Sequence, residues 1–247
     1  MLYFPENANL PSGRVDTVIM SDKKQDIINE LRNNYHIETI TPMPVTGICG
    51  SEKYHADMSV CHIGGKLFFA DSGNQELIKT LSVSGAEVIT SERITAESPK
   101  LNVCILKDKL ICNTKTADKS LIQNCKDHGK KIVHTKQRYA KCSTAVISEN
   151  AVITADESIA RVCHAEKIDV LKISVGQIML DGYDYGFIGG CCGFISKYLL
   201  AFSGDVRKHT DYENIRSFAG NYGINLVSLG NEVLYDVGGI IPVSEKK

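Results

Sequence analysis

The chain contains no tryptophan, and aromatic residues make only 7% of it, so its core must be built largely from aliphatic side chains. Neither sign of charge is in excess: 28 Lys and Arg stand against 29 Asp and Glu, which argues against nucleic-acid binding through bulk positive charge. No apolar run approaches the roughly 18 residues that span a bilayer. The opening MLYFPE has neither a basic segment nor a long apolar segment, so we predict no signal peptide. We therefore expect a cytoplasmic protein with no membrane and no nucleic-acid partner.

Cysteine is the unexpectedly frequent residue. The chain has nine cysteines, an odd number. Without a signal peptide, this indicates reduced thiols rather than a disulfide framework. Most of them are expected to pack as small buried apolar side chains.

Internal repetition is the strongest pattern in the sequence. Five segments share apolar residues at helical spacing, and their first apolar anchors lie 50, 44, 38 and 56 residues apart. The segments are 25–31, 75–81, 119–125, 157–163 and 213–219. Each predicts a short amphipathic helix, and Asp22, Asp118 and Asp211 are candidate N-caps.

Predicted strands surround these helices. A β-like run follows each helix, at 37–40, 86–89, 131–134, 168–171 and 224–227. A strand pair with a tight turn precedes four helices, at 60–70, 103–112, 145–154 and 186–196, and the last is followed by a further strand at 198–202. The first unit is split between the chain ends, with its inner strand predicted at 233–237, continued by 240–241, and its outer strand at 15–20.

Five ββαβ units whose terminal strands close one blade predict a single α/β domain over residues 1–247. We expect a five-bladed β/α propeller, because a closed ring leaves no exposed sheet edge. Two connections, 42–54 and 176–185, are expected to cap the same end of its axial channel.

Polar residues gather where the first strand of each unit would begin, near the axis. They are His55 to Asp57, Lys100, Lys141 and Cys142, Asp181 to Tyr185, and Tyr235 with Asp236. Buried charges must be paired, so this set indicates a small charged ligand. The alternative is that these residues occupy solvated loops.

Two segments carry a resemblance to a known family. His55-Ala56-Asp57-Met58-Ser59-Val60 resembles the His-x-Asp motif of the pentein fold, found in deiminases, dimethylarginine hydrolases and amidinotransferases that modify guanidino groups. Residues 236–244, DVGGIIPVS, resemble the Gly-Gly-x-x-Cys segment that carries the family nucleophile. The likeness is greatest to a bacterial branch described only by its fold. It implies that a Cys thiolate attacks the guanidinium carbon, a His moves protons and carboxylates hold the cation.

The sequence departs from the family pattern at three points. Pro242 occupies the position of the nucleophile and cannot attack a substrate. Ile188 stands where the deiminases have the carboxylate of a Glu-Gly-Gly pattern. His55 lies in an early repeat, whereas the deiminases carry their His-x-Asp late, so internal repetition alone is an alternative origin of the motif.

The resemblance and the departures together give one set of candidate residues. His55 is the expected acid/base, Asp57 and Asp184 are expected to hold the cation, and Cys191 or Cys192 is expected to supply the thiol. Lys100, Tyr185 and Asp236 complete the expected ligand-binding residues. The alternative for both cysteines is a structural role, with one packed inward and the other in a glycine-rich turn.

Two further hypotheses remain open. A non-catalytic binding or structural protein could have kept the fold after losing the nucleophile, as Pro242 suggests. A metal-assisted hydrolase would use Cys49, His55 and the Cys191–Cys192 pair. The nearby group of Cys49, His55, Cys61 and His62 has a spacing that matches no zinc pattern. We therefore predict no metal and no cofactor, expect a small cationic ligand, and leave a homo-oligomer open.

Overall fold

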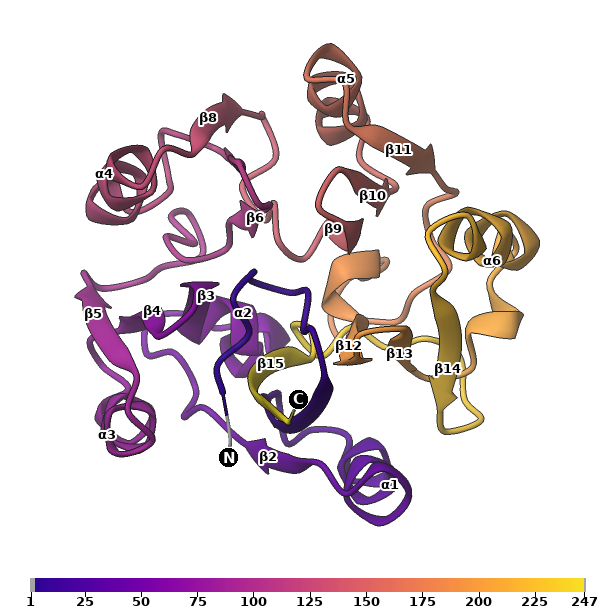
Figure 1. The fold of residues 1–247 in the computed structure, drawn as a ribbon, viewed down its shortest axis with the longest axis horizontal. Coiled ribbons are helices and arrows are strands. Elements are labelled where there is room, and N and C mark those ends of the chain that lie inside the picture. Colours follow the sequence, from indigo (N-terminus) through magenta and orange to yellow (C-terminus); the bar gives the residue numbers. More distant parts are fainter. Residues whose placement is uncertain (1–2, 247) are drawn as a thin grey trace.

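The computed structural model describes residues 3–246 and contains small β-sheets gathered around a common centre, with helices at the periphery (Figure 1). The repeated motif is an antiparallel strand pair, a helix, and a third strand parallel to the second. Three units form separate three-stranded sheets. Their elements are β3 (Val60–Gly64), β4 (Leu67–Asp71), α3 (Gln75–Val83) and β5 (Glu87–Ser91); β6 (Cys104–Ile105), β7 (Lys109–Cys112), α4 (Lys119–Asp127) and β8 (Lys131–His134); and β9 (Thr144–Ser148), β10 (Ala151–Thr154), α5 (Glu157–Ala165) and β11 (Asp169–Lys172).

The remaining two units share one six-stranded sheet. One contains β12 (Cys192–Ser196), β13 (Leu199–Ser203), α6 (Tyr212–Gly220) and β14 (Asn225–Leu229). The other joins the two chain ends and contains β15 (Ile241–Lys246), β1 (Arg14–Ile19), α1 (Gln25–Tyr35) and β2 (Glu38–Ile40). Short helical turns lie at η1 (Ser51–Tyr54), α2 (Ala56–Ser59), η2 (Ile188–Gly190) and η3 (Val206–Lys208). The chain ends therefore complete one unit together.

The prediction of an inner strand at 233–237 is wrong. The strand that pairs with β1 is β15, and Tyr235 makes only an isolated bridge to Met179. Gly238 and Gly239 have positive φ values and interrupt extended structure just before β15. Pro242 fits within β15 because this strand lies at the end of the sheet, where a missing backbone donor is tolerated.

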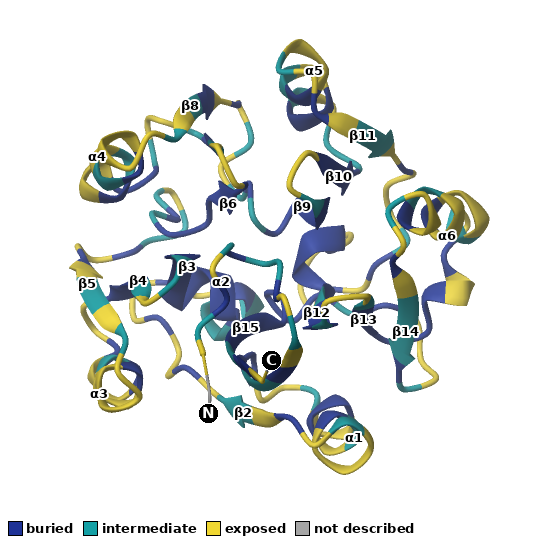
Figure 2. Ribbon diagram, viewed as in Figure 1, coloured by how far each residue is buried: buried dark blue, intermediate teal, exposed yellow. Residues whose placement is uncertain are grey.

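The five predicted helices are present, and their apolar faces are buried. The anchors Ile27, Leu77, Leu121, Ile159 and Ile215 are each at most 3% exposed. Asp118 caps α4 as predicted, whereas α1 and α6 have no side-chain cap. Figure 2 shows buried chain toward the centre and exposed outer faces on the helices. Among the described helices, none has the length and hydropathy needed to cross a membrane.

Candidate functional site

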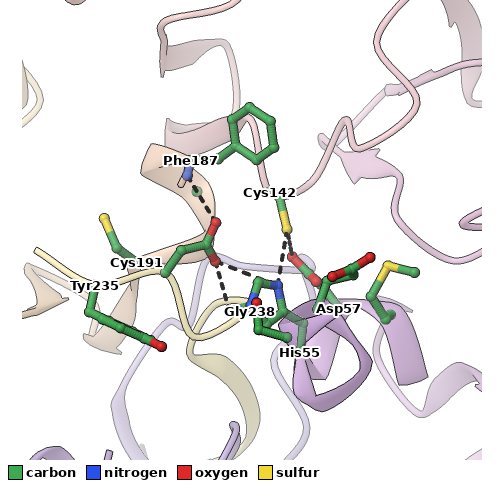
Figure 3. A network of polar contacts seen from close by, with 12 residues as sticks. His55, Asp57, Cys142, Phe187, Cys191, Tyr235 and Gly238 are labelled. Carbon is green, nitrogen blue, oxygen red and sulfur yellow. Dashed lines mark hydrogen bonds and ion pairs between the residues drawn. The ribbon is translucent and has the colours of Figure 1, made fainter. Parts of the chain in front are cut away.

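Segments that precede the first strands of different units come together in one network of polar contacts (Figure 3). His55 is the residue before α2, and Asp57 lies within α2, directly upstream of β3. Cys142 precedes β9, and Asp236 precedes β15. Residues far apart in the sequence therefore form one polar cluster.

The cluster centres on the Cys142 thiol. Its Sγ donates a hydrogen bond to Asp57 Oδ2 at 2.7 Å and lies 4.0 Å from His55 Nδ1. His55 Nδ1 in turn lies 3.6 Å from Asp236 Oδ1. All four residues are at most 4% exposed. A thiol, an imidazole and two carboxylates thus share a site nearly closed to water.

The backbone fixes Asp236. Its Oδ2 accepts a hydrogen bond from the Phe187 amide at 2.9 Å, and its Oδ1 accepts one from the Gly238 amide at 3.0 Å. Gly190 packs so tightly against this carboxylate that a Cβ at Gly190 would overlap it. The glycine-rich 186–190 segment therefore serves to bring backbone against Asp236.

Asn102 holds the thiol from the other side and is fully buried. Its Oδ1 accepts hydrogen bonds from the amides of Lys141 at 3.0 Å and Cys142 at 3.1 Å. Its Nδ2 donates to Cys142 Sγ at 3.4 Å. A donor aimed at sulfur favours the thiolate, so Asn102 both positions Cys142 and stabilises its charged form.

Burial governs the protonation of this cluster. It raises the pKa of Asp57 to about 6, although nearby His55 and Lys141 lower it. Burial also raises the pKa of the Cys142 thiol well above its usual range, and the carboxylates of Asp57 and Asp236 add to the shift. Both effects favour the protonated form of the Cys142 thiol.

A cavity of about 300 Å³ opens above the thiol. Its lining combines acidic and aromatic side chains: Glu52, His55, Tyr139, Cys142, Leu180, Tyr183, Asp184, Tyr185, Phe187 and Asp236. Two loops meet beside it, because Tyr183 donates to Glu52 Oε2 at 2.6 Å and Ser51 Oγ donates to the Asp181 carbonyl at 2.6 Å. The expectation that segments 42–54 and 176–185 reach the same end of the molecule is confirmed by these contacts.

Three of the clustered residues have the ligand types of a divalent-metal site. The ligand atoms of His55, Asp57 and Cys142 all lie within 4.8 Å of one another. Cys142 and Asp57 replace the Cys49 and Cys191–Cys192 set considered from the sequence. Cys49 is exposed, and the paired cysteines lie outside this cluster. The absence of a metal stays a prediction.

The structure brings most of the predicted site residues together. His55, Asp184, Tyr185 and Asp236 line the cavity, and Asp57 lies behind the thiol. Lys100 does not join them, because it forms an ion pair with Glu92 at 2.5 Å and lines a separate hollow beside the start of α4. The prediction that Lys100 shares the site with His55 is therefore corrected.

Cys191 and Cys192 are placed differently from the expectation. Both lie in an apolar cluster with Phe194 and Phe202, and neither lines the cavity. The Cys191 thiol donates to the Ile188 carbonyl at 3.2 Å, and Figure 3 shows its sulfur apart from the His55 group. Burial raises the pKa of both thiols. Their surroundings agree with the alternative of a structural role for Cys191 and Cys192. The thiol at the site is that of Cys142.

Cys142 was not among the cysteines predicted from the sequence to supply the thiol. The available signal was its position a few residues upstream of the first strand of a unit, where His55 and Asp236 also lie. The Gly-Gly-Cys-Cys run is the more conspicuous feature of the sequence and favoured Cys191 and Cys192.

Several solved structures are similar to this chain in fold. The DDAH of Pseudomonas aeruginosa, solved as a Cys-to-Ser mutant with citrulline, is 11% identical, covers 88% of this chain and 92% of its own, and has a TM-score of 0.56. An inosamine-phosphate amidinotransferase from Streptomyces griseus is 11% identical over 99% of this chain and 98% of its own, with a TM-score of 0.55. C. jejuni agmatine deiminase is 11% identical over 93% and 90%, with a TM-score of 0.53. The chain therefore has the α/β pentein fold.

Sequence comparison assigns the chain to a family without a described function. No curated protein matches the chain in sequence. A family model described as "Family of unknown function (DUF6873)" matches residues 18–241, and the chain belongs to that family.

Proposed function

We propose that this protein is a cysteine-dependent hydrolase or transferase that acts on the amidino or guanidino carbon of a small molecule, with Cys142 as its nucleophile. The observation that carries the proposal is the Cys142 thiol between Asp57 and His55 beneath a cavity lined by further carboxylates. Thiol, imidazole and carboxylate are the groups that nucleophilic attack on an amidinium carbon needs.

The charge of the site favours a cationic substrate. Glu52, Asp184 and Asp236 line the cavity, and Asp57 Oδ1 has no hydrogen-bond partner among the described residues. A planar amidinium offers several N–H donors to such oxygens and stacks on aromatic rings such as Tyr185 and Phe187. Its positive charge near Sγ would lower the pKa of the Cys142 thiol, so the substrate itself would promote formation of the nucleophile.

The proposed reaction has two halves. In the first, the thiol proton leaves Sγ through Asp57 and His55 and reaches the departing nitrogen, while a bond forms between Sγ and the amidino carbon and the carbon–nitrogen bond breaks. In the second, water or an amine attacks the carbon of the covalent adduct, its proton passes to the cluster, and the bond to Sγ breaks to restore the thiol.

We further infer that the five units are blades of a propeller with this site on its axis. Every unit then presents the start of its first strand to one centre, and any of them can supply a catalytic group. A thiol from the unit that begins at β9 would compensate for Pro242 in β15.

A turnover assay with matched variants tests the proposal. The wild-type protein is first treated with a chelator to remove any bound metal. It should then release ammonia or an amine from at least one of a panel of small guanidino and amidino compounds. Cys142→Ser should abolish release, whereas Cys191→Ser should retain it. Release that survives Cys142→Ser would contradict the proposal, and stoichiometric binding without release would favour the non-catalytic binding protein.

A further inference from the structure

One of the five units differs from the others in charge. The stretch from residue 100 to residue 141, which contains β6, β7, α4 and β8, has eleven Lys and Arg residues but only three Asp and no Glu. The rest of the chain has 17 basic and 26 acidic residues. The nearly neutral net charge is therefore the sum of one basic unit and an acidic remainder.

The repeated fold provides a comparison within the molecule. Residues 104–134 have seven Lys and three Asp, whereas the equivalent ranges have two basic and three acidic residues (60–91), three and five (144–172), and four and three (192–229). Each of these units presents an exposed helix face to the outside (Figure 2), so the need for a soluble surface applies to all of them equally. The excess of positive charge on one unit therefore requires an explanation of its own.

Four lysines of this unit form a basic surface. Lys115 lies in the loop before α4, and Lys119 and Lys126 lie on α4. Their separation is close to two helical turns, so both lie on the same side of the helix. Lys136 follows β8, and Asn113 Nδ2 donates a hydrogen bond to its carbonyl at 3.0 Å, which brings it beside the loop of Lys115. All four lysines are exposed, and none forms an ion pair with a carboxylate of residues 3–246.

A hollow of about 350 Å³ lies at one end of the basic surface, lined by Lys100, Lys115 and Lys119. Two carboxylates share this lining, and both have partners. Glu92 pairs with Lys100, and Asp118 accepts hydrogen bonds from serine hydroxyls and from the first amides of α4. Further hydroxyl groups come from Thr90, Ser98, Thr116 and Ser120. Three lysines against two carboxylates leave the hollow positive, so it fits a carboxylate better than a cation.

The surroundings of the basic surface favour a short acidic polypeptide over other anionic partners. The nine residues of α4 span only about 13 Å, so the phosphates of a nucleic-acid duplex would extend beyond it over acidic units. Within the described part of 100–141 there is no exposed tyrosine or phenylalanine for a base to stack on, and no exposed large apolar side chain to enter a lipid surface.

We propose that α4 and the loop before it dock an acidic segment of another protein, with one of its carboxylates in the hollow and the others beside the lysines of the basic surface. None of these four lysines lines the cavity above Cys142, so the inference does not depend on the proposed function. Exposed ion pairs are individually weak and are screened by salt, so this docking is reversible and sensitive to ionic strength.

The test uses the full chain and a fluorescein-labelled peptide of alternating glutamate and glycine, titrated by fluorescence anisotropy at low salt. The same peptide with glutamine in place of glutamate should bind much more weakly. The combined variant Lys115→Glu/Lys119→Glu/Lys126→Glu should weaken binding of the acidic peptide about tenfold, because three exposed contacts become repulsive. A carbodiimide, which joins carboxylates to amines, should couple the peptide to lysines of the basic surface, as identified by mass spectrometry.

A matched control makes the same change in net charge on other units. Lys66→Glu/Lys79→Glu/Arg161→Glu replaces three exposed basic residues that form no ion pair among the described residues, and it should leave the affinity nearly unchanged. Equal weakening by the two triple variants, coupling spread over all units, or no saturable binding would overturn the inference. Tighter binding of a short DNA duplex than of the peptide would also overturn it, in favour of a nucleic acid.

Discussion

Asn102 connects the backbone around Cys142 to its sulfur. Removing its side chain in Asn102→Ala leaves the amides of Lys141 and Cys142 without this acceptor and the Cys142 sulfur without this donor, which should lower the free energy of unfolding by about 1–3 kcal/mol. If Asn102 positions the thiol, the pKa of Cys142 should also be higher in Asn102→Ala than in wild type. The pH–rate profile of Cys142 alkylation should then shift to higher pH. Asn113→Ala is the control, because that exposed amide bonds the Lys136 carbonyl far from the thiol. An unshifted profile in Asn102→Ala would show that Asn102 is merely structural.

Asp57 predicts a specific dependence of stability on pH. The ordinary pKa of an aspartate is 3.8, and the pKa of Asp57 in the folded protein is about 6, so between these values the native state keeps a proton that the unfolded chain has lost. Stability from this group is therefore present below about pH 4 and lost as pH rises through about 6, on the order of 3 kcal/mol.

The measurement is the free energy of unfolding against pH for wild type and Asp57→Asn. The difference between the two curves should change across that window, with wild type losing stability relative to the variant as pH rises. Parallel curves would mean that the pKa of Asp57 is not raised in the folded protein.

Among the structural elements, the turn that leads into β15 depends on glycine for two reasons. Gly238 has φ +74° and a Cβ there would overlap His55, whereas Gly129 has φ +76° and a Cβ there would meet nothing within 4 Å. Gly129→Ala should therefore lower the free energy of unfolding by only about 1 kcal/mol, the strain of a positive φ at a residue with a side chain. Gly238→Ala should cost clearly more and also displace His55, as measured by denaturant unfolding and by slower alkylation of Cys142. Equal costs for the two variants would refute the close approach.

Pro242 lies within β15 and is not part of the polar cluster around Cys142. It pairs with Val18 in the register of β15 and β1, and it does not line the cavity above the Cys142 thiol. The variant Cys142→Ser/Pro242→Cys, which restores a cysteine at the position of the family motif, should therefore stay inactive in the turnover assay. Recovered turnover would show that the site is organised around β15 instead.

For the molecule as a whole, the sequence predicts those elements that have a regular local spacing of apolar residues. The five helices and the strands that follow them can be read from apolar spacing, and closure by the chain ends follows from the incomplete first unit. The C-terminal strand is harder to place because 233–237 is more apolar than 241–246, and only the pairing with β1 identifies 241–246 as the strand. The reactive thiol could not be predicted for a related reason. Cys142 approaches His55 only because two units pack together, and no short sequence motif indicates such packing.

Selective alkylation of Cys142 tests the central claim most directly. The protein is treated at neutral pH with limiting chloroacetamidine or with chloroacetamide, which differ mainly in charge, and the modified cysteines are identified by peptide mass spectrometry. Exposed Cys49 is the internal reference for intrinsic reactivity. We predict that chloroacetamidine labels Cys142 faster than Cys49, that chloroacetamide does not, and that His55→Ala removes the preference. Slow labelling of Cys142 by both reagents, or faster labelling of Cys191 or Cys192, would contradict the account.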